Sequence, residues 1–141
     1  MKKAEPKKPE AVLDASALLA HIYEERGAHL VGKAIDSGAA ISVVNWIEVL
    51  SRLADDGEDP ELASEEITAD NLVKTTIRIE PVTARDAIEA ARLRPLTRGN
   101  GLSLADRTCL VLGKRLSVPV LTADREWTGL GDISGSVKLI R

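Results

Sequence analysis

Short apolar runs alternate with segments of helical periodicity along most of this chain, and an acidic residue stands at four of the junctions between them. These residues are Asp14, Glu48, Asp106 and Asp124. Strands that are separated by helical segments predict a parallel sheet with helices on both faces. In such a sheet the strand-to-helix junctions lie along one edge, where folds of this class bind their ligands. We therefore expect the four carboxylates to meet at one edge of an α/β sheet.

The hydrophobic pattern predicts the order of the elements. Apolar residues between Trp46 and Leu53 recur at i, i+3, i+4 and i+7, which is typical of an amphipathic helix. Residues 77–82 alternate in polarity, and Pro81 favours the edge of the sheet or the end of a strand. Strands are expected at 11–13, 40–43, 77–82, 118–121 and 137–140, and helices at 16–23, 30–38, 46–53, 83–93 and 103–116.

The composition fits one domain with a single core. The 141 residues are 44% hydrophobic, but they include no Phe, two Trp and one Tyr. The core must therefore consist of Ala, Leu, Val and Ile, as in parallel strands that are covered by helices. So few aromatic side chains exclude an extended surface for base stacking. We expect residues 11–141 to form a single domain with a central, mostly parallel sheet of about four to five strands.

The first ten residues differ from the rest of the chain. They hold four Lys, two Glu and two Pro and almost nothing apolar, which predicts a basic, disordered leader. This leader lacks the apolar stretch of a secretory signal, and no run in the chain is long enough to span a bilayer. The single cysteine, Cys109, cannot form an internal disulfide and is expected as a small buried residue on a helix. These features favour a cytoplasmic protein without membrane contact.

Four carboxylates at one sheet edge would raise one another's pKa values unless a positive charge neutralised them. A divalent cation with oxygen ligands is the usual neutralising group, and it indicates a metal-dependent hydrolase. Hydroxyl side chains stand two residues from two of the acids, because Ser16 follows Asp14 and Thr122 precedes Asp124. Such hydroxyls are suited to hold a carboxylate or a water next to a metal.

Each acid also has a purely structural explanation. Asp14 and Asp124 are suited to cap helices, and the segments 45–48 and 103–106 match the capping box with an acid at its last position. Negative charge at a helix start stabilises an exposed helix by about 0.3–1 kcal/mol. Glu48 also lies roughly opposite the apolar stripe of its helix, as a solvated side chain would. Capping does not require an acid at all four junctions, however, and the conjunction favours a shared site.

Four motifs carry a resemblance to a known family. They are Val-Leu-Asp-Ala-Ser-Ala-Leu-Leu at 12–19, Ile-Ser-Val-Val-Asn-Trp-Ile-Glu-Val-Leu-Ser-Arg-Leu at 41–53, Gly-Leu-Ser-Leu-Ala-Asp-Arg-Thr-Cys-Leu at 101–110 and Val-Pro-Val-Leu-Thr-Ala-Asp-Arg-Glu-Trp at 118–127. In this order and spacing they resemble the PIN domain and, more closely, the VapC ribonuclease toxins of bacterial toxin–antitoxin modules. The resemblance covers the chain from about Val12 to Arg141 and implies a PIN-like three-layer α/β/α fold.

The resemblance also implies an activity, namely metal-dependent hydrolysis of RNA phosphodiester bonds with Mg²⁺ or Mn²⁺, in tRNA or ribosomal RNA. Asp14 and Asp106 are the implied direct ligands, and Glu48 and Asp124 are implied to bind the metal directly or through water. The implied protein partners are a cognate antitoxin and a second copy in a homodimer. An antitoxin segment is implied to lie in a groove that involves the first two helices and the helices after Glu48.

Three further residues are candidates for a role beside the acids. Arg107 and Arg125 directly follow two of the proposed ligands and are the better candidates to contact the RNA backbone. Asn45 lies one helical turn before Glu48 and could orient it or a phosphate, although capping is the stronger interpretation.

Three alternatives place similar residues in other functions. A phosphoacceptor receiver domain needs a lysine beside its acidic pocket after a late strand, whereas Lys138 lies inside the last expected strand. A haloacid-dehalogenase-type phosphatase needs Asp-x-Asp after the first strand, and here the third residue of that motif is Ser16. A catalytically quiet PIN domain that binds protein or RNA is the more serious alternative, and the intact acids argue against it.

Overall fold

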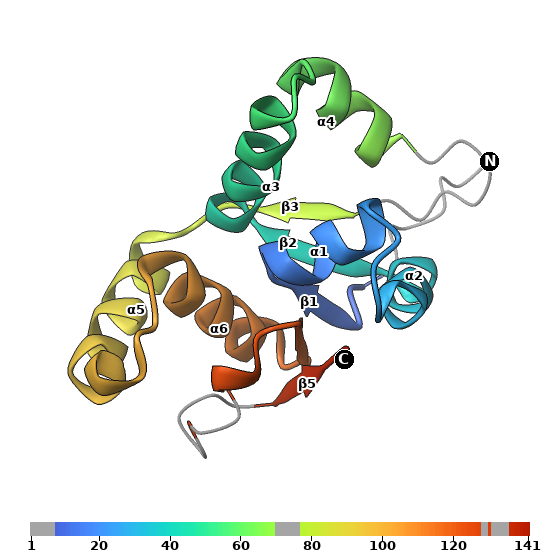
Figure 1. The fold of residues 1–141 in the computed structure, drawn as a ribbon. Coiled ribbons are helices and arrows are strands. Elements are labelled where there is room, and N and C mark those ends of the chain that lie inside the picture. The colour runs from blue at the N-terminus through green and yellow to red at the C-terminus, as the bar shows by residue number, and fades with distance from the viewer. Residues whose placement is uncertain (1–7, 70–76, 128–129, 131–135) are drawn as a thin grey trace, which may run out of the picture.

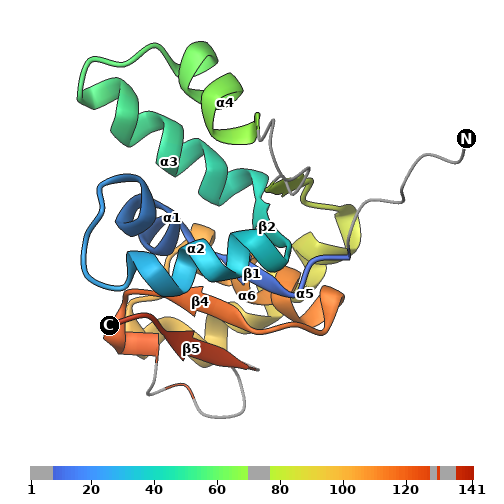
Figure 2. The same cartoon turned by 90° about the vertical axis from the view of Figure 1, so that its right-hand side faces the viewer.

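A parallel sheet of five strands forms the centre of the described part of the molecule (Figures 1 and 2). The structure is a computed structural model that describes residues 8–69, 77–127, 130 and 136–141. The strands are β1 (Ala11–Leu13), β2 (Ala39–Ser42), β3 (Arg78–Glu80), β4 (Val120–Thr122) and β5 (Val137–Leu139). They lie in the order β3-β2-β1-β4-β5, and every neighbouring pair is parallel. The expected sheet is confirmed, and the strand expected near Pro81 is an edge strand.

Helices cover both faces of this sheet, which confirms the three-layer arrangement (Figure 2). One layer contains α1 (Ala15–Ile22), α2 (Ala28–Ser37) and α3 (Val43–Asp55), and the other contains α5 (Ala84–Thr97) and α6 (Leu104–Leu116). The short α4 (Pro60–Thr68) packs against α3, and the two helices project from the body of the molecule (Figure 1). A single turn of 3-10 helix (Arg98–Asn100) joins α5 to the loop before α6.

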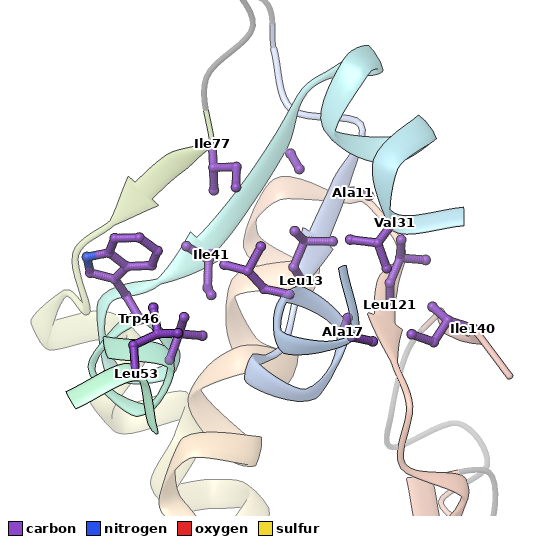
Figure 3. Close-up of a cluster of buried hydrophobic side chains, with 14 of the residues drawn as sticks. Ala11, Leu13, Ala17, Val31, Ile41, Trp46, Leu53, Ile77, Leu121 and Ile140 are labelled. Atoms are coloured by element: carbon purple, nitrogen blue, oxygen red, sulfur yellow. The ribbon is translucent and has the colours of Figure 1, made fainter. Parts of the chain in front are cut away.

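Alternation along the strands distributes the apolar side chains between two cores. Leu13 and Ile41 pack with α1, α2 and α3, together with Trp46 and Leu53 (Figure 3). Val12, the neighbour of Leu13, packs instead with α5 and α6 on the opposite face. Because both faces of the central strands are buried, these strands consist of continuous apolar runs rather than alternating polar and apolar residues.

The largest differences from the expected helix boundaries are at the start of α3 and at the end of α5. Helix α3 begins at Val43 rather than at Trp46, because the hydroxyl of Ser42 accepts a hydrogen bond from the amide of Val44 at 3.2 Å. The expectation that Asn45 caps this helix is therefore wrong. Helix α5 continues beyond Leu93 to Thr97, whose buried hydroxyl donates to the carbonyl of Leu93 at 2.7 Å.

The folded part of the chain includes the end of the expected leader. Pro9 is buried, and the amide of Glu10 donates to the carbonyl of Gly38 at 2.9 Å, next to the pairing of β1 with β2. The first seven residues of the leader lie outside the described residues. Within the described parts of the chain, no helix combines the length and the apolar character that crossing a membrane requires.

Candidate active site

Asp14 lies at the centre of the carboxyl edge of the sheet. It directly follows β1, which has β2 on one side and β4 on the other. Its backbone is extended, and its Oδ1 accepts a hydrogen bond from the amide of Ala17 at 2.8 Å, so that Asp14 caps α1. The residue is 4% exposed. The structural explanation of Asp14 as a helix cap is thus confirmed, but a cap does not have to be buried.

Two hydroxyl groups hold the carboxylate of Asp14. The hydroxyl of Ser16 donates to Oδ1 at 2.7 Å, and the hydroxyl of Thr122, at the end of β4, donates to Oδ2 at 2.6 Å. Each hydroxyl also accepts a backbone amide, from Ala123 at 2.9 Å for Ser16 and from Asp124 at 3.0 Å for Thr122. Both donor hydroxyls are thereby oriented, and both carboxylate oxygens are fixed.

Asp106 and Glu48 come from the two helical layers. Asp106 lies in the first turn of α6, where its carboxylate accepts the amide of Ser103 at 2.9 Å while the hydroxyl of Ser103 accepts the amide of Asp106 at 3.1 Å. This arrangement confirms the capping box expected there. Glu48 lies in the middle of α3 and is exposed, so that the box expected at 45–48 is absent.

Three of the acids interact electrostatically. Burial raises the pKa of Asp14 to about 6, although hydrogen bonds from Thr122, Ala17 and Ser16 lower it, and the charge of Asp106 raises it further. Partial burial also raises the pKa of Glu48, and the charges of Asp106 and Asp14 add to this effect. The negative charges around Asp14 and Glu48 favour the binding of a cation at this edge of the sheet.

Cys109 lies beneath these acids. It is fully buried on α6, and its thiol points to the carbonyl of Leu13 at 3.9 Å. Burial raises the pKa of this thiol well above its ordinary value, and the charges of Asp14, Asp106 and Glu48 raise it further. The thiol is therefore protonated at neutral pH, and the expectation of a small buried residue on a helix is confirmed.

Asp124 lies at the margin of this group. Its amide donates to the hydroxyl of Thr122, and its Oδ1 accepts the amide of Glu126 at 2.9 Å. Its charge is not among the main influences on the pKa of Asp14 or Glu48. The structure thus brings three of the four acids together and links Asp124 to them through Thr122.

The remaining candidate side chains lie in different surroundings. The guanidinium of Arg107 donates to the carbonyl of Ala90 on α5 at 3.0 Å, which ties α6 to α5, and its buried Nε has no acceptor among the described residues. Arg125 is exposed directly after Asp124. The buried side chain of Asn45 contacts the backbone next to two acids, which sequence reasoning did not anticipate. Its position four residues before the buried Val49 places it on the apolar stripe of α3, and this was the available signal.

The donor set suits a hard divalent cation. In the described ranges, no three Asp, Glu, His or Cys side chains are placed so that they could hold a metal ion together. Mg²⁺ commonly uses one or two carboxylates and fills its other positions with water and substrate phosphates, so that a complete protein cage is not required. A carboxylate offers about four acceptor positions, and Asp14 uses three of them for Ser16, Ala17 and Thr122. One acceptor position on Oδ2 of Asp14 therefore remains for a cation.

Comparisons with known proteins identify the family and the fold. The PIN domain family matches residues 11–132. No curated protein matches the chain. Three solved structures of similar fold are a toxin–antitoxin complex from Klebsiella pneumoniae (TM-score 0.69, 19% identity, covering 93% of this chain and 98% of that chain), DNA-bound VapBC from Salmonella typhimurium (0.67, 16%, 94% and 98%) and VapBC-5 from Mycobacterium tuberculosis (0.55, 24%, 94% and 99%). At these identities the likeness establishes the fold.

Proposed function

This chain belongs to the PIN domain family, and from that premise we propose that it is a divalent-metal-dependent endoribonuclease that acts as the toxin of a toxin–antitoxin pair. The observation that carries the proposal is the meeting of Asp14, Glu48 and Asp106, from three elements, at the carboxyl edge of the sheet. The charge of Asp106 raises the pKa values of Asp14 and Glu48, and a bound cation would offset this effect.

The four acids are proposed to bind Mg²⁺ or Mn²⁺ in different ways. Asp14 and Asp106 are the proposed direct ligands, and Glu48 and Asp124 bind directly or through water. A bound cation would lower the pKa of a water molecule and stabilise the negative charge that develops on the RNA phosphate. Asp14 is held in one orientation by Ser16 and Thr122, so that its remaining acceptor position is fixed before the cation arrives. Such preorganisation reduces the rearrangement required during the reaction.

Substrate contacts are proposed around the acids. Arg125 is exposed beside Asp124 and is suited to contact the RNA backbone. The guanidinium of Arg107 already bonds to α5, so that its proposed contribution is to hold α6, and with it Asp106, in place. With a net charge of −3 and few aromatic residues, the chain has to rely on the cation and on local arginines to bind a polyanion.

An antitoxin is the proposed protein partner. The solved structures of similar fold include toxin–antitoxin complexes. This chain has a cavity of about 550 Å³ between α1, α2, α3 and α4, with Leu18, Ile22 and Leu53 among its apolar walls and Glu58 and Glu66 among its acidic ones. Apolar and acidic walls suit a helical segment with apolar and basic side chains. A homodimer is proposed from the resemblance to the toxin family.

A catalytically quiet PIN domain is the second candidate. It is favoured by one observation, namely that Asp14 and Asp106 both cap helices and would be needed for the fold alone. The two candidates differ in what Asp106→Asn does. Asparagine can still accept the amide of Ser103, so that this variant keeps the cap and removes the charge.

The deciding experiment is cleavage of total cellular RNA by purified protein with Mg²⁺, with Mn²⁺ and with EDTA, beside the Asp106→Asn variant. We expect discrete fragments that require the metal and disappear in the variant. Circular dichroism has to show that the variant is folded. Asp36, an exposed acid near the end of α2, gives the matched control, because Asp36→Asn should cleave like the wild type. Folded, antitoxin-free wild type that cuts no RNA with either metal would favour the binding module.

A further inference from the structure

Asn45 is a buried polar side chain at the meeting point of the three helices that carry the acids. It lies on α3 and is 1% exposed. Its Oδ1 accepts the amide of Ala15 in α1 at 3.4 Å, and its Nδ2 donates to the carbonyl of Ala105 in α6 at 3.2 Å. A single side-chain amide therefore joins α3 to the first turns of α1 and α6.

The two contacts lie directly beside the acids. Ala15 follows Asp14 in the chain, and Ala105 precedes Asp106. Asn45 itself lies one helical turn before Glu48 on α3. We propose that Asn45 is a positioning residue that sets the spacing of Asp14, Glu48 and Asp106 around the cation. This inference rests on the proposed function, and it assigns the geometry of that site to a residue that does not itself have to touch the metal.

The hydrogen-bond partners of Asn45 support a positional role over a purely structural one. The carbonyl of Ala105 also accepts the hydroxyl of Thr108 at 2.9 Å, so that it stays paired without Asn45. The amide of Ala15 lies in the first turn of α1, where amides have no partner inside the helix, and its bond to Asn45 is long. The carbonyl of Ala105 does not need Asn45, whereas the amide of Ala15 gains from it an acceptor that α1 itself lacks. Together the two bonds connect three helices.

The side-chain amide is suited to this position because it presents an acceptor and a donor on one short planar group. Leucine has a similar volume and neither function, so that Asn45→Leu removes both bonds while filling the space. Alanine removes both bonds and leaves space that water can enter. Thr97→Val is the matched control, because it removes a buried hydrogen bond, to Leu93, from α5, which carries none of the four acids.

The test is calorimetric titration of Mn²⁺ into the full-length wild type, Asn45→Leu, Asn45→Ala and Thr97→Val, with RNA cleavage measured on the same samples. We expect both Asn45 variants to bind Mn²⁺ at least about tenfold more weakly, the usual scale for groups that orient metal ligands. Their kcat should fall, and KM for RNA should change by less than about twofold, because the reacting groups and not the substrate contacts are displaced. Thr97→Val should match the wild type in Mn²⁺ affinity and kcat, even if it unfolds at a lower temperature.

Two other outcomes are distinguishable from each other. Wild-type Mn²⁺ affinity and kcat in either folded Asn45 variant would overturn the positioning role and leave the proposed function intact. A wild type that neither binds Mn²⁺ nor cleaves RNA would overturn the proposed function. The positioning role of Asn45 would then be rejected as well, because it presupposes a metal site. The alanine variant keeps the test available if the leucine variant does not fold.

Discussion

The carboxylate of Asp14 is subject to two opposing influences. Three hydrogen bonds stabilise its charged form, and burial together with the charge of Asp106 destabilises it. Burial is the larger effect, so that the pKa rises from 3.8 to about 6. An acid that served only as a helix cap would be more stable on the surface, where its charge is solvated. The molecule thus accepts a loss of stability at this residue, which is common where function requires a buried charge.

The raised pKa predicts that Asp14→Asn stabilises the metal-free protein at alkaline pH. The carboxyl group of Asp14 binds its proton more tightly in the folded state than in the unfolded state. The free energy of unfolding of the wild type therefore falls as pH rises from about 4 to 6 and stays low above pH 6. A shift of about two pKa units corresponds to roughly 3 kcal/mol. Asparagine keeps the acceptor for the amide of Ala17 and carries no charge. The free energy of unfolding of the variant therefore does not decrease over this pH range for this reason.

Urea unfolding in EDTA at pH 8 and at pH 4.5 measures this effect. The difference in unfolding free energy between Asp14→Asn and the wild type should favour the variant at pH 8 and shrink at pH 4.5, while RNA cleavage is lost. Asp36→Asn should show no such pH-dependent difference. An Asp14→Asn variant less stable than the wild type at pH 8 would show that the hydrogen bonds outweigh burial.

At the scale of elements, the sequence was informative about strands and helices and less so about side-chain contacts between them. Hydrophobic periodicity predicted the five described strands and five of the described α-helices, because buried residues determine each pattern, but it did not predict the short α4. The cap of α3 was misassigned, because Ser42 and Asn45 both fit an N-cap and only the packed structure buries Asn45. The extension of α5 past Pro95 was not visible either, because a proline usually ends a helix.

The same limit applies to the candidate site. The positions of Asp14 and Asp124 follow from the parallel sheet, since strand ends meet at one edge, whereas Asp106 lies at the start of α6, which no strand directly precedes. The marginal place of Asp124 does not follow, because it depends on the turn after β4, where its carboxylate accepts the amide of Glu126. The link from Thr122 to Asp14 joins strands that are far apart in the chain, and the sequence indicated only that a hydroxyl was near each acid.

Helix α6 allows the capping and catalytic roles of Asp106 to be separated. Asp106→Asn keeps an acceptor for the amide of Ser103, whereas Asp106→Ala leaves that amide without its side-chain partner. We expect both variants to lose RNA cleavage. The alanine variant should have an unfolding free energy lower than that of the asparagine variant by roughly 0.5–1.5 kcal/mol. Chemical denaturation in EDTA measures the difference, and equal stabilities would show that the capping box contributes little.

The close approach of α6 to β4 predicts that Gly113→Ala is destabilising. A Cβ at this position would lie 2.5 Å from Cγ2 of Val120 and 3.4 Å from the carbonyl of Val118. Overpacking of this kind costs about 1–3 kcal/mol, which exceeds the gain of up to about 1 kcal/mol in helix propensity. Thermal unfolding should show a lower Tm for Gly113→Ala than for the wild type, and the decrease that Gly113→Ala causes should be smaller when Val120 is also replaced by Ala. An equal decrease in Tm in both backgrounds would show that the added Cβ does not act through a clash with Val120.

At the scale of the whole molecule, the sheet order explains why acids from distant parts of the chain share one site. β1 lies between β2 and β4, so that Asp14 after β1 is flanked by α3 after β2 and by the turn after β4. The fourth element, α6, packs under β1 and β2 and brings Asp106 to the same edge. Acids from the first and second halves of the chain thus face one another and repel. A cation bound between them would replace this repulsion by attraction.

This arrangement predicts that Mn²⁺ or Mg²⁺ stabilises the whole fold. A cation that binds the folded state alone adds about 2.7 kcal/mol at a concentration one hundred times its Kd, which corresponds to a Tm increase of roughly 5–10 °C at this chain length. The increase should be smaller at pH 5 than at pH 8, because below the pKa of about 6 the cation must displace a proton from Asp14. Differential scanning fluorimetry of the wild type, Asp14→Asn and Asp36→Asn measures it, and we expect the increase in the wild type and in Asp36→Asn alone. Samples with Na⁺ at the same ionic strength remove general salt effects. An equal increase in Asp14→Asn would then mean that the metal binds elsewhere.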